Sequence, residues 1–378
     1  MRFRFDADHD DLREAVRRPL ADSPPGACDA RAAVRLAREI GVYGLCVPER
    51  FGGGGFGMLE LGVVFQEAGR AAFDAPLLSP VLAADLLLPA ASFDSGSDVA
   101  ADLLARIAAG ELVAAPAIAE GPLGWDCTPA TTATPSSAPS ASTRRWRLSG
   151  VKDWVQDGMR ANRFIVSART ADGPALFAVA ANEPGLTVEP VESIDISRRF
   201  ARLRLDGASA ALLPVKDATA AVRRTRDRGL ALLSADNVGV TGRCLEMATS
   251  WAKERSQFGQ VIGSFQAIKH KLADVRLELE AAESACLYAL WAAQEAPSEL
   301  PAVARIAAHT CGEAALLAAE ENIQVHGGIG ATWEHPAHVY LRRATAGRRL
   351  LADPQALLED LARIVEETVF VSTAVLAR

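Results

Sequence analysis

The sequence predicts a mainly α-helical protein with a small antiparallel β domain in its middle and a four-helix bundle at its C-terminus. Apolar residues recur at three- and four-residue spacing through the first 112 residues and again from about residue 222, which is typical of helices. Between these regions lie short runs of β-branched and aromatic residues, several alternating with polar ones, which indicate strands. A chain of 378 residues is also too long for one ordinary core. We therefore expect three domains, at residues 1–112, 113–218 and 219–378.

The first domain is expected to consist of helices joined by loops. Helical spacing recurs in residues 29–45, 58–73 and 97–112. The glycine-rich segment PERFGGGGFG, residues 48–57, separates the first two of these helices. Its glycines lack the order of a phosphate-binding fingerprint and no clear strand precedes them, so the segment is expected to form only a flexible turn.

The middle domain is expected to be a set of short antiparallel strands separated by turn residues. The candidate strands are residues 113–120, 144–156, 163–169, 175–181, 186–192 and 198–207. Residues 127–143, CTPATTATPSSAPSAST, contain no aromatic or large aliphatic side chain. This composition cannot anchor a segment in a core, so a mobile loop is expected there.

The third domain is expected to be an antiparallel bundle, because long helical patterns follow one another with short turns between them. These patterns cover residues 229–255, 264–296, 299–326 and about 353–370. The segment RRATAGRR, residues 342–349, is locally basic. It is expected to be a solvated helix end, although a phosphate would also suit it.

Composition excludes several functional classes. The net charge of −7 argues against general nucleic-acid binding, which needs a basic face. No run of about 18 apolar residues is present, so no membrane span is expected. The N-terminus carries charges throughout and lacks the apolar stretch of a signal peptide, so a cytoplasmic location is expected. The six cysteines form no C-x-x-C pair or metal-ligand spacing, and we interpret them as reduced core residues.

The break between the first two bundle helices carries the first candidate site. It reads ERSQFGQVIGSFQ, with Arg255 at the end of one helix, Gln257 and Phe258 at the break, and Gly259 to bend the chain. An arginine offers a planar, permanent charge that suits a pyrophosphate. The alternative is a solvated arginine and a core phenylalanine at an ordinary helix hairpin.

The second candidate site is ENIQVHGGIGATWEHP, residues 321–336. Gln324 lies on the last turn of a helix, and Gly327 and Gly328 would allow a ligand to approach the backbone closely. The alternative for the two glycines is a simple helix cap. His326 and His335 have no further ligand to complete a metal site, so they are interpreted as structural.

In this order and on this architecture, the two stretches resemble the acyl-CoA dehydrogenase family. PERFGGGGFG and LSGVKDWVQDG give weaker support, and the likeness covers about residues 10–365. The resemblance implies the three-domain fold and a dimer or tetramer that binds FAD. It also implies removal of hydrogens from the α and β carbons of an acyl-CoA, with a carboxylate taking the α proton. Carried over by motif, the residues that contact a cofactor bound mainly by a neighbouring subunit are Arg255, Gln257, Phe258, Gln324, Gly327 and Gly328.

The chain departs from the family pattern where the catalytic glutamate should stand. The usual position of this glutamate corresponds to Leu351, and the alternative position on the first bundle helix corresponds to Gly229. Neither residue can accept a proton, and the sequence therefore names no catalytic residue. Asp353 lies two positions beyond Leu351, and Asp227 and Asp236 flank Gly229 at a distance.

The residues expected to form the flavin pocket also differ from the family pattern. Trp125 stands where the family has a small hydroxyl residue, and its bulk could fill the pocket. Gln156 replaces the usual Thr or Ser, whereas Trp154 matches the aromatic residue found beside the ring in many members.

These losses favour one hypothesis over three others. We expect a base-lacking subunit of a heteromeric acyl-CoA dehydrogenase that donates contacts to a FAD shared across the interface with a homologous subunit. Such pairs in the family act on bulky substrates such as steroid side chains. The alternatives are a self-sufficient homomeric dehydrogenase with Asp353 or another acid as base, a recruited member or scaffold that acts on carrier-protein thioesters, and a pure interaction protein. Electron-transferring flavoprotein is the acceptor that the resemblance implies.

Overall fold

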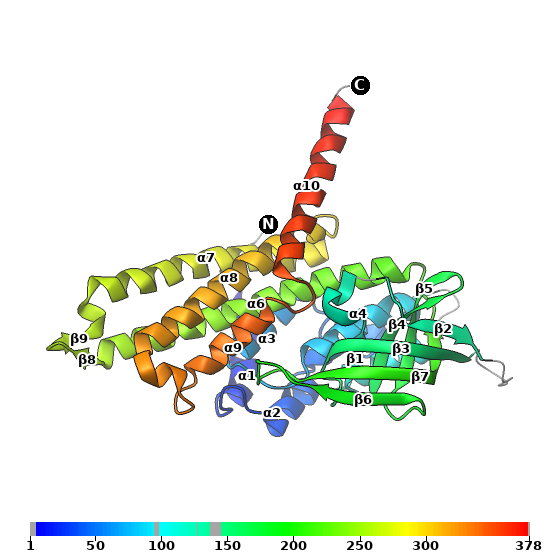
Figure 1. Ribbon diagram of the computed structural model, residues 1–378, viewed down its shortest axis with the longest axis horizontal. Coiled ribbons are helices and arrows are strands. Elements are labelled where there is room, and N and C mark those ends of the chain that lie inside the picture. The colour runs from blue at the N-terminus through cyan, green and yellow to red at the C-terminus, as the bar shows by residue number, and fades with distance from the viewer. Residues whose placement is uncertain (1–4, 94–97, 127, 137–144, 377–378) are drawn as a thin grey trace.

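The computed structural model describes residues 5–93, 98–126, 128–136 and 145–376. Long helices run side by side along the main axis, the β-sheet lies at one end, and a small hairpin forms the tip of the other end (Figure 1). The order of helices, strands and helices agrees with the expected fold class. No described helix is long and apolar enough to cross a membrane.

The N-terminal region is helical, as expected. Its helices are α1 (Ala7–Leu20), α2 (Ala30–Val34), α3 (Met58–Arg70), α4 (Leu78–Ala91) and α5 (Asp98–Ala108). Asp6 begins α1 with a capping box in which its side chain accepts from the His9 backbone, so the first turn has its donors satisfied. Helix α4 is apolar on nearly all sides and is buried accordingly.

The glycine-rich segment forms a turn that packs closely on residues 44–47. The backbone N–H of Gly54 donates to Gly44 O at 2.9 Å, and that of Phe56 donates to Leu45 O at 2.8 Å. A Cβ on Gly53 would stand 2.1 Å from Val47 O, so no larger residue fits there. Close approach of two backbone segments is therefore one reason for the run of glycines.

The described residues of the middle region form a seven-stranded sheet whose pairings close on themselves. Its strands are β1 (Ala114–Ala117), β2 (Thr132–Pro135), β3 (Arg145–Gln156), β4 (Arg163–Thr170), β5 (Gly173–Ala180), β6 (Leu186–Val191) and β7 (Phe200–Leu213). Strands β4, β2, β3, β7 and β5 pair in a ring, because β4 also pairs with β5. The core within this ring includes Trp146 and Phe177, whose rings lie 5.5 Å apart.

Two expectations for this region were wrong in part. The sheet is mixed rather than purely antiparallel, because β1 and β2 both run parallel to β4. Residues 132–135 form a paired strand within the segment expected to be a mobile loop. Their Thr and Ala side chains are small, but the backbone hydrogen bonds to β3 hold them in the sheet. The rest of that expectation falls partly on residues 127 and 137–143, outside the described residues.

The C-terminal region is built on three long helices, α6 (Ala218–Glu254), α7 (Gln266–Glu295) and α8 (Leu300–His326). The fourth packed helix is α9 (Ala337–Gly347), which lies against α8 and α6. The sequence instead predicted that the C-terminal helix, about residues 353–370, would be the fourth helix of the bundle. That helix, α10 (Pro354–Leu376), is held at its first turns and then projects from the body (Figure 1). Strands β8 (Ser256–Gln257) and β9 (Gln260–Val261) form the hairpin between α6 and α7.

The helical regions share one hydrophobic core. Buried side chains of α1, α3, α4 and α5 belong to the same cluster as those of α6, α7 and α8. The base of α10 joins the bundle through ion pairs, since Arg305 of α8 lies 3.0 Å from Asp360 and 3.1 Å from Asp227. A continuous helical body therefore holds the sheet at one end and the hairpin at the other.

Candidate functional site

A cavity of about 440 Å³ opens between helix α4, the end of strand β3 and the segment that joins α9 to α10. Its wall includes the aromatic residues Trp125, Trp154 and Phe200 together with Leu82 and Leu351. Apolar surface with a few polar groups is the usual composition of a small-molecule site. This cavity contains the positions that the sequence singled out for a flavin ring and a base.

A break in strand pairing brings Trp154 to this cavity. The register of β3 on β7 shifts between Lys152 and Val155, and Trp154 within the shift has a φ of +53°. Its ring meets that of Phe200 edge-on, with the centroids 6.0 Å apart, and stays about half exposed. Bulges of this kind re-aim side chains next to functional sites.

Trp125 does not fill the cavity, contrary to the expectation from its size. It forms part of the wall shared by the 440 Å³ cavity and a neighbouring one of about 80 Å³. The short helical segment that carries it, Gly121–Asp126, contains Gly124 at a φ of +64°. The backbone thus departs from helical geometry one residue before Trp125, which the residue type alone does not reveal.

The two positions at which the family resemblance would place a base meet in space. A Cβ on Gly229 of α6 would stand only 2.5 Å from Leu351 Cδ1. Leu351 has a φ of +69°, an unusual value for a branched side chain. The site where a carboxylate would be expected is thus occupied by a leucine methyl group that packs over a bare helix backbone.

The nearby acids named from the sequence are engaged elsewhere. Asp353 lines the cavity, but its Oδ2 accepts from Arg349 at 2.8 Å and its Oδ1 accepts from the Gln355 backbone at 2.9 Å. Asp227 pairs with Arg305 and Arg226. Both carboxylates are therefore already engaged by partners within this chain.

One acid that the sequence did not single out lies just behind the cavity wall. Asp157 is fully buried next to Gln156, and the Ser79 hydroxyl lies 2.6 Å from its Oδ2. Burial raises the pKa of Asp157 to about 6. Ser79 and Gln156 line the cavity, so a single hydroxyl separates this carboxyl from it. In the sequence, Asp157 is a single aspartate after a predicted strand, and many ordinary turn residues look the same.

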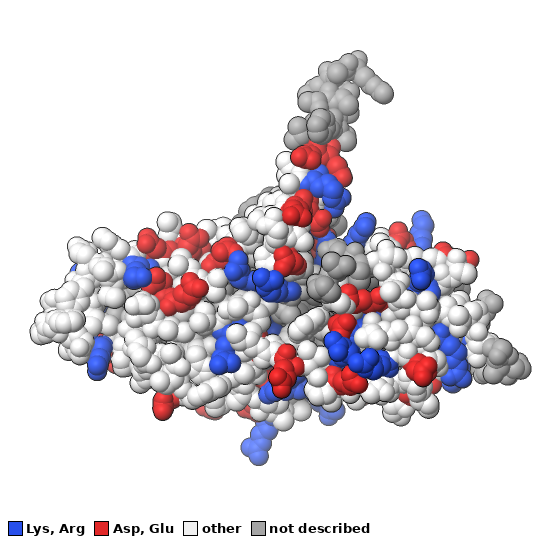
Figure 2. All heavy atoms as spheres, viewed as in Figure 1, with Lys and Arg blue, Asp and Glu red and all other residues white. Residues whose placement is uncertain are grey.

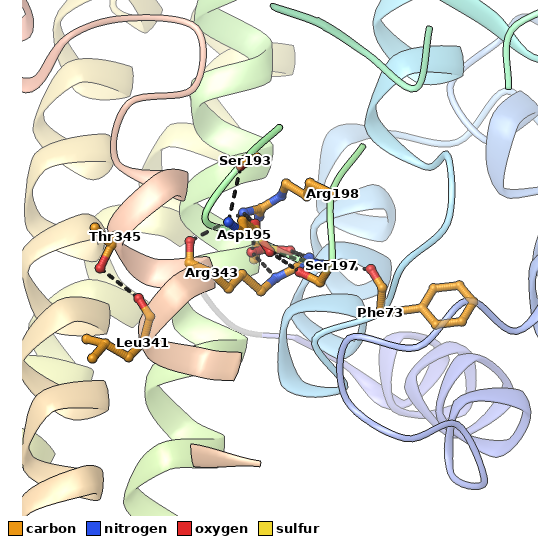
Figure 3. A network of polar contacts seen from close by, with 9 residues as sticks. Phe73, Ser193, Asp195, Ser197, Arg198, Leu341, Arg343 and Thr345 are labelled. Atoms are coloured by element: carbon orange, nitrogen blue, oxygen red, sulfur yellow. Dashed lines mark hydrogen bonds and ion pairs between the residues drawn. The ribbon is translucent and has the colours of Figure 1, made fainter. Parts of the chain in front are cut away.

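A buried network of ion pairs and hydrogen bonds joins three separate segments of the chain (Figure 3). The carboxylate of Asp236 on α6 accepts hydrogen bonds from Arg198 at 2.7 Å and from Arg343 Nε at 3.1 Å. The carboxylate of Asp195 accepts a hydrogen bond from Arg198 at 2.9 Å. Burial opposes ionisation of Asp236, but Arg343 and Arg198 outweigh it and hold its pKa below the ordinary value. The network joins α9 to the loop between β6 and β7.

The expectation of a solvated end for residues 342–349 was therefore wrong at Arg343. This side chain is 4% exposed and faces Asp236, 107 residues earlier in the chain. Its partner is invisible to local sequence patterns, because a buried charge depends on a compensating group elsewhere.

At the far end of the bundle, the β8–β9 hairpin exposes the first candidate motif. Phe258 is 91% exposed, and Arg255 and Gln257 are also exposed. Phe258 has a φ of +55° in the turn between β8 and β9. Few charged atoms appear at this tip (Figure 2). Phe258 is therefore not a core residue of a simple helix hairpin.

The second candidate motif lies at the same end. Gln324 is exposed on the last turn of α8, and Gly327 follows as its C-cap with a φ of +66°. A Cβ on Gly328 would meet no atom within 4 Å, and its φ is not positive. Packing within this chain therefore does not explain the absence of a side chain at Gly328.

A stack of rings joins the two motifs. Trp251 of α6 stacks on His326 with centroids 5.1 Å apart, and His326 lies 4.1 Å from His335. The Nδ1 of His326 donates to Asn322 O at 2.7 Å. Both histidines thus have packing roles, as expected. Trp251 had not been identified from the sequence, although it lies one helical turn before Arg255.

Comparison with known protein families gives two matches. The model described as "Acyl-CoA dehydrogenase, N-terminal domain" matches residues 6–111, and the model described as "Acyl-CoA dehydrogenase, C-terminal domain" matches residues 219–365. The chain is 33% identical over 333 residues to the acyl-CoA dehydrogenase IpdE2 of Mycobacterium tuberculosis. This alignment covers 88% of the chain and 86% of IpdE2.

Two solved structures of complexes are also similar. One is a variant of the Tcur3481-Tcur3483 steroid ACAD, with 30% identity, a TM-score of 0.83 and coverage of 96% of this chain and 98% of that one. The other is the ChsE4-ChsE5 complex from Mycobacterium tuberculosis, with 26% identity, a TM-score of 0.81 and coverage of 97% and 99%.

Proposed function

This chain belongs to the acyl-CoA dehydrogenase family of FAD-dependent oxidoreductases, and from that premise we propose that it is the base-lacking subunit of a heteromeric member. In this role the chain donates the tip of its bundle to a FAD held mainly by a homologous partner, which supplies the catalytic carboxylate. The reaction is α,β-dehydrogenation of an acyl thioester. The complexes named for two similar structures support a paired assembly.

One observation carries the shared-cofactor part of the proposal. Gly229 and Arg255 belong to the same helix, α6 and its C-cap, and are 26 residues apart. At a rise of 1.5 Å per residue, this corresponds to roughly 39 Å. Arg255 is therefore too far from this chain's own cavity to serve a reactive ring there. In the proposed arrangement, a dinucleotide that Arg255 contacts would have its reactive end on another molecule.

The residues at the tip fit a dinucleotide. Arg255 would hold the pyrophosphate, because the described residues include no carboxylate within ion-pairing distance of its guanidinium. Gln324 and the open backbone at Gly327 and Gly328 would contact the phosphate and sugar part of the same cofactor. Phe258 would cover apolar surface of the partner. The bound FAD supplies the two-electron oxidation, whereas these groups only bind and orient it.

The missing base supports the second part of the proposal. The contact of Leu351 with Gly229 leaves no acid at either expected position, and Asp353 is engaged by Arg349. Abstraction of an α proton without a positioned base loses roughly 10²–10⁴-fold in rate. A partner that carries the carboxylate removes this difficulty.

The proposal is tested by expressing the chain alone and together with a homologous acyl-CoA dehydrogenase subunit. The purified pair is expected to contain fewer flavins than polypeptides by absorbance. Arg255→Ala in this chain should lower its flavin content, whereas Arg35→Ala should not, because Arg35 is paired with Glu39 on a distant surface. A chain that is fully flavinated alone and is bleached by acyl-CoA would overturn the proposal.

A self-sufficient homomeric dehydrogenase is the second candidate, and the open 440 Å³ cavity with Asp353 in its wall favours it. In that case Asp353→Asn in the chain purified alone should abolish bleaching of the flavin by acyl-CoA. In the heteromeric case the same substitution leaves the activity of the complex nearly unchanged. The two candidates thus predict opposite outcomes for one variant.

A further inference from the structure

The exposed side chain of Arg255 contacts an aromatic ring rather than a carboxylate. Its guanidinium carbon lies 5.9 Å from the centre of the Trp251 ring, and the described residues give it no ion-pair partner. Trp251 is four residues earlier on α6, so the two side chains share one face of the helix. A guanidinium over an indole is attracted by the ring without using its N–H donors.

The indole itself is fixed by a second layer. Trp251 stacks on His326 at 5.1 Å with an angle of 26° between the planes, and His326 lies 4.1 Å from His335. His326 is tied to the backbone of α8 through its 2.7 Å bond to Asn322 O. The ring of Trp251 is thus held between α6, α8 and the segment before α9. It cannot turn away from Arg255 without breaking this stack.

We propose that Trp251 is a positioning residue that orients Arg255 toward an anionic ligand, namely the pyrophosphate of the dinucleotide in the partner's site. This inference rests on the proposed function and adds the group that prepares Arg255 for binding. An exposed arginine loses side-chain entropy when it is fixed on a ligand. A ring that restricts the guanidinium beforehand, and leaves its five donors free, reduces that loss.

The experiment measures FAD affinity of the complex of this chain with its homologous partner, after removal of the flavin and titration with FAD. Trp251→Leu is expected to raise the dissociation constant about two- to fivefold, the range of an exposed cation–π contact. Trp251→Phe should lie between Trp251→Leu and wild type, because phenylalanine keeps a weaker ring in place. Phe51→Leu is the matched control, since it removes a ring 4.9 Å from Arg50 in the distant glycine-rich turn and should leave the constant unchanged.

A double substitution separates positioning from general damage to the tip. In an Arg255→Ala background, Trp251→Leu should have no further effect on FAD affinity, because the group that it positions is gone. Equal effects of Trp251→Leu with and without Arg255, or no effect at all, would overturn the positioning role. If Arg255→Ala alone leaves FAD affinity unchanged, the proposed function itself fails, and this inference fails with it. Thermal unfolding of each variant chain identifies any loss of fold, and Trp251→Phe then remains the deciding variant.

Discussion

Leu351 packs over Gly229 so tightly that a Cβ on the glycine would stand 2.5 Å from the leucine Cδ1. These two residues come from α6 and from the loop before α10, 122 positions apart. Leu351 lines the cavity of about 440 Å³, so its packing on Gly229 removes the place for an acid without closing the site.

A double-mutant cycle tests this contact. Gly229→Ala in wild type should be neutral or destabilising, because the new methyl must displace Leu351. In a Leu351→Ala background it should stabilise by up to about 1 kcal/mol, the gain of alanine over glycine inside a helix. Chemical unfolding of the four proteins gives the coupling. Additive effects would show that the two residues do not meet as described.

Asp236 should be among the least replaceable residues of the chain. Asp236→Asn leaves Arg198 and Arg343 buried with less compensation, which should cost about 3–5 kcal/mol of unfolding free energy. Glu189→Gln is the control, because Glu189 pairs with Arg204 at an exposed site, where such pairs contribute less than about 1 kcal/mol. Similar losses in the two variants would contradict the role of the network.

Replacement of Asp157 should stabilise the chain at neutral pH. Its folded pKa of about 6 lies above the ordinary value, so the folded state disfavours the charged form, and this cost is fully present above pH 6. Asp157→Asn should therefore gain up to about 3 kcal/mol at pH 7.5. The gain should shrink as the pH falls from 6 to 4, because the acid then becomes neutral in the folded state. A gain that does not depend on pH would rule out ionisation as its cause.

The histidines at the tip predict the opposite response to acid. Burial lowers the pKa of His326, of His335 (with a contribution from His326 and His338) and of His338. Below about pH 6.5 the unfolded chain binds protons that the folded chain resists, so stability falls as the pH falls. His335→Gln should reduce the loss of stability between pH 7.5 and 5.5, because one group that resists protonation in the folded chain is removed. Thermal unfolding at the two pH values measures it, and an unchanged loss would contradict the assignment.

The long bundle helices were predictable because each repeats its apolar spacing over many turns. The identity of the fourth packed helix was not predictable from the sequence. Helix α9 buries Arg343, and arginine is normally a residue of the exposed surface. The carboxylate of Asp236 on another helix compensates the buried charge of Arg343. The strand at residues 132–135 was missed for a similar reason, because pairing with β3 outweighs its weak side-chain pattern.

The candidate site was predictable only in part. The motifs around Arg255 and Gln324 gave residues that the structure places at one end of the bundle, joined by the stack of Trp251 on His326. The meeting of Gly229 and Leu351 also agrees with the two separate motif alignments. By contrast, the size of Trp125 does not reveal that its side chain forms part of the wall of a cavity of about 440 Å³ that stays open. Asp157 was missed because burial, rather than residue type, makes it unusual.

The open surroundings of Gly328 have a practical consequence for screening. A library of variants sorted by yield or melting temperature would accept many residues there, since an added Cβ touches nothing in the isolated chain. Any intolerance would emerge only when the chain meets its counterpart, so a two-component selection is the appropriate way to map this surface.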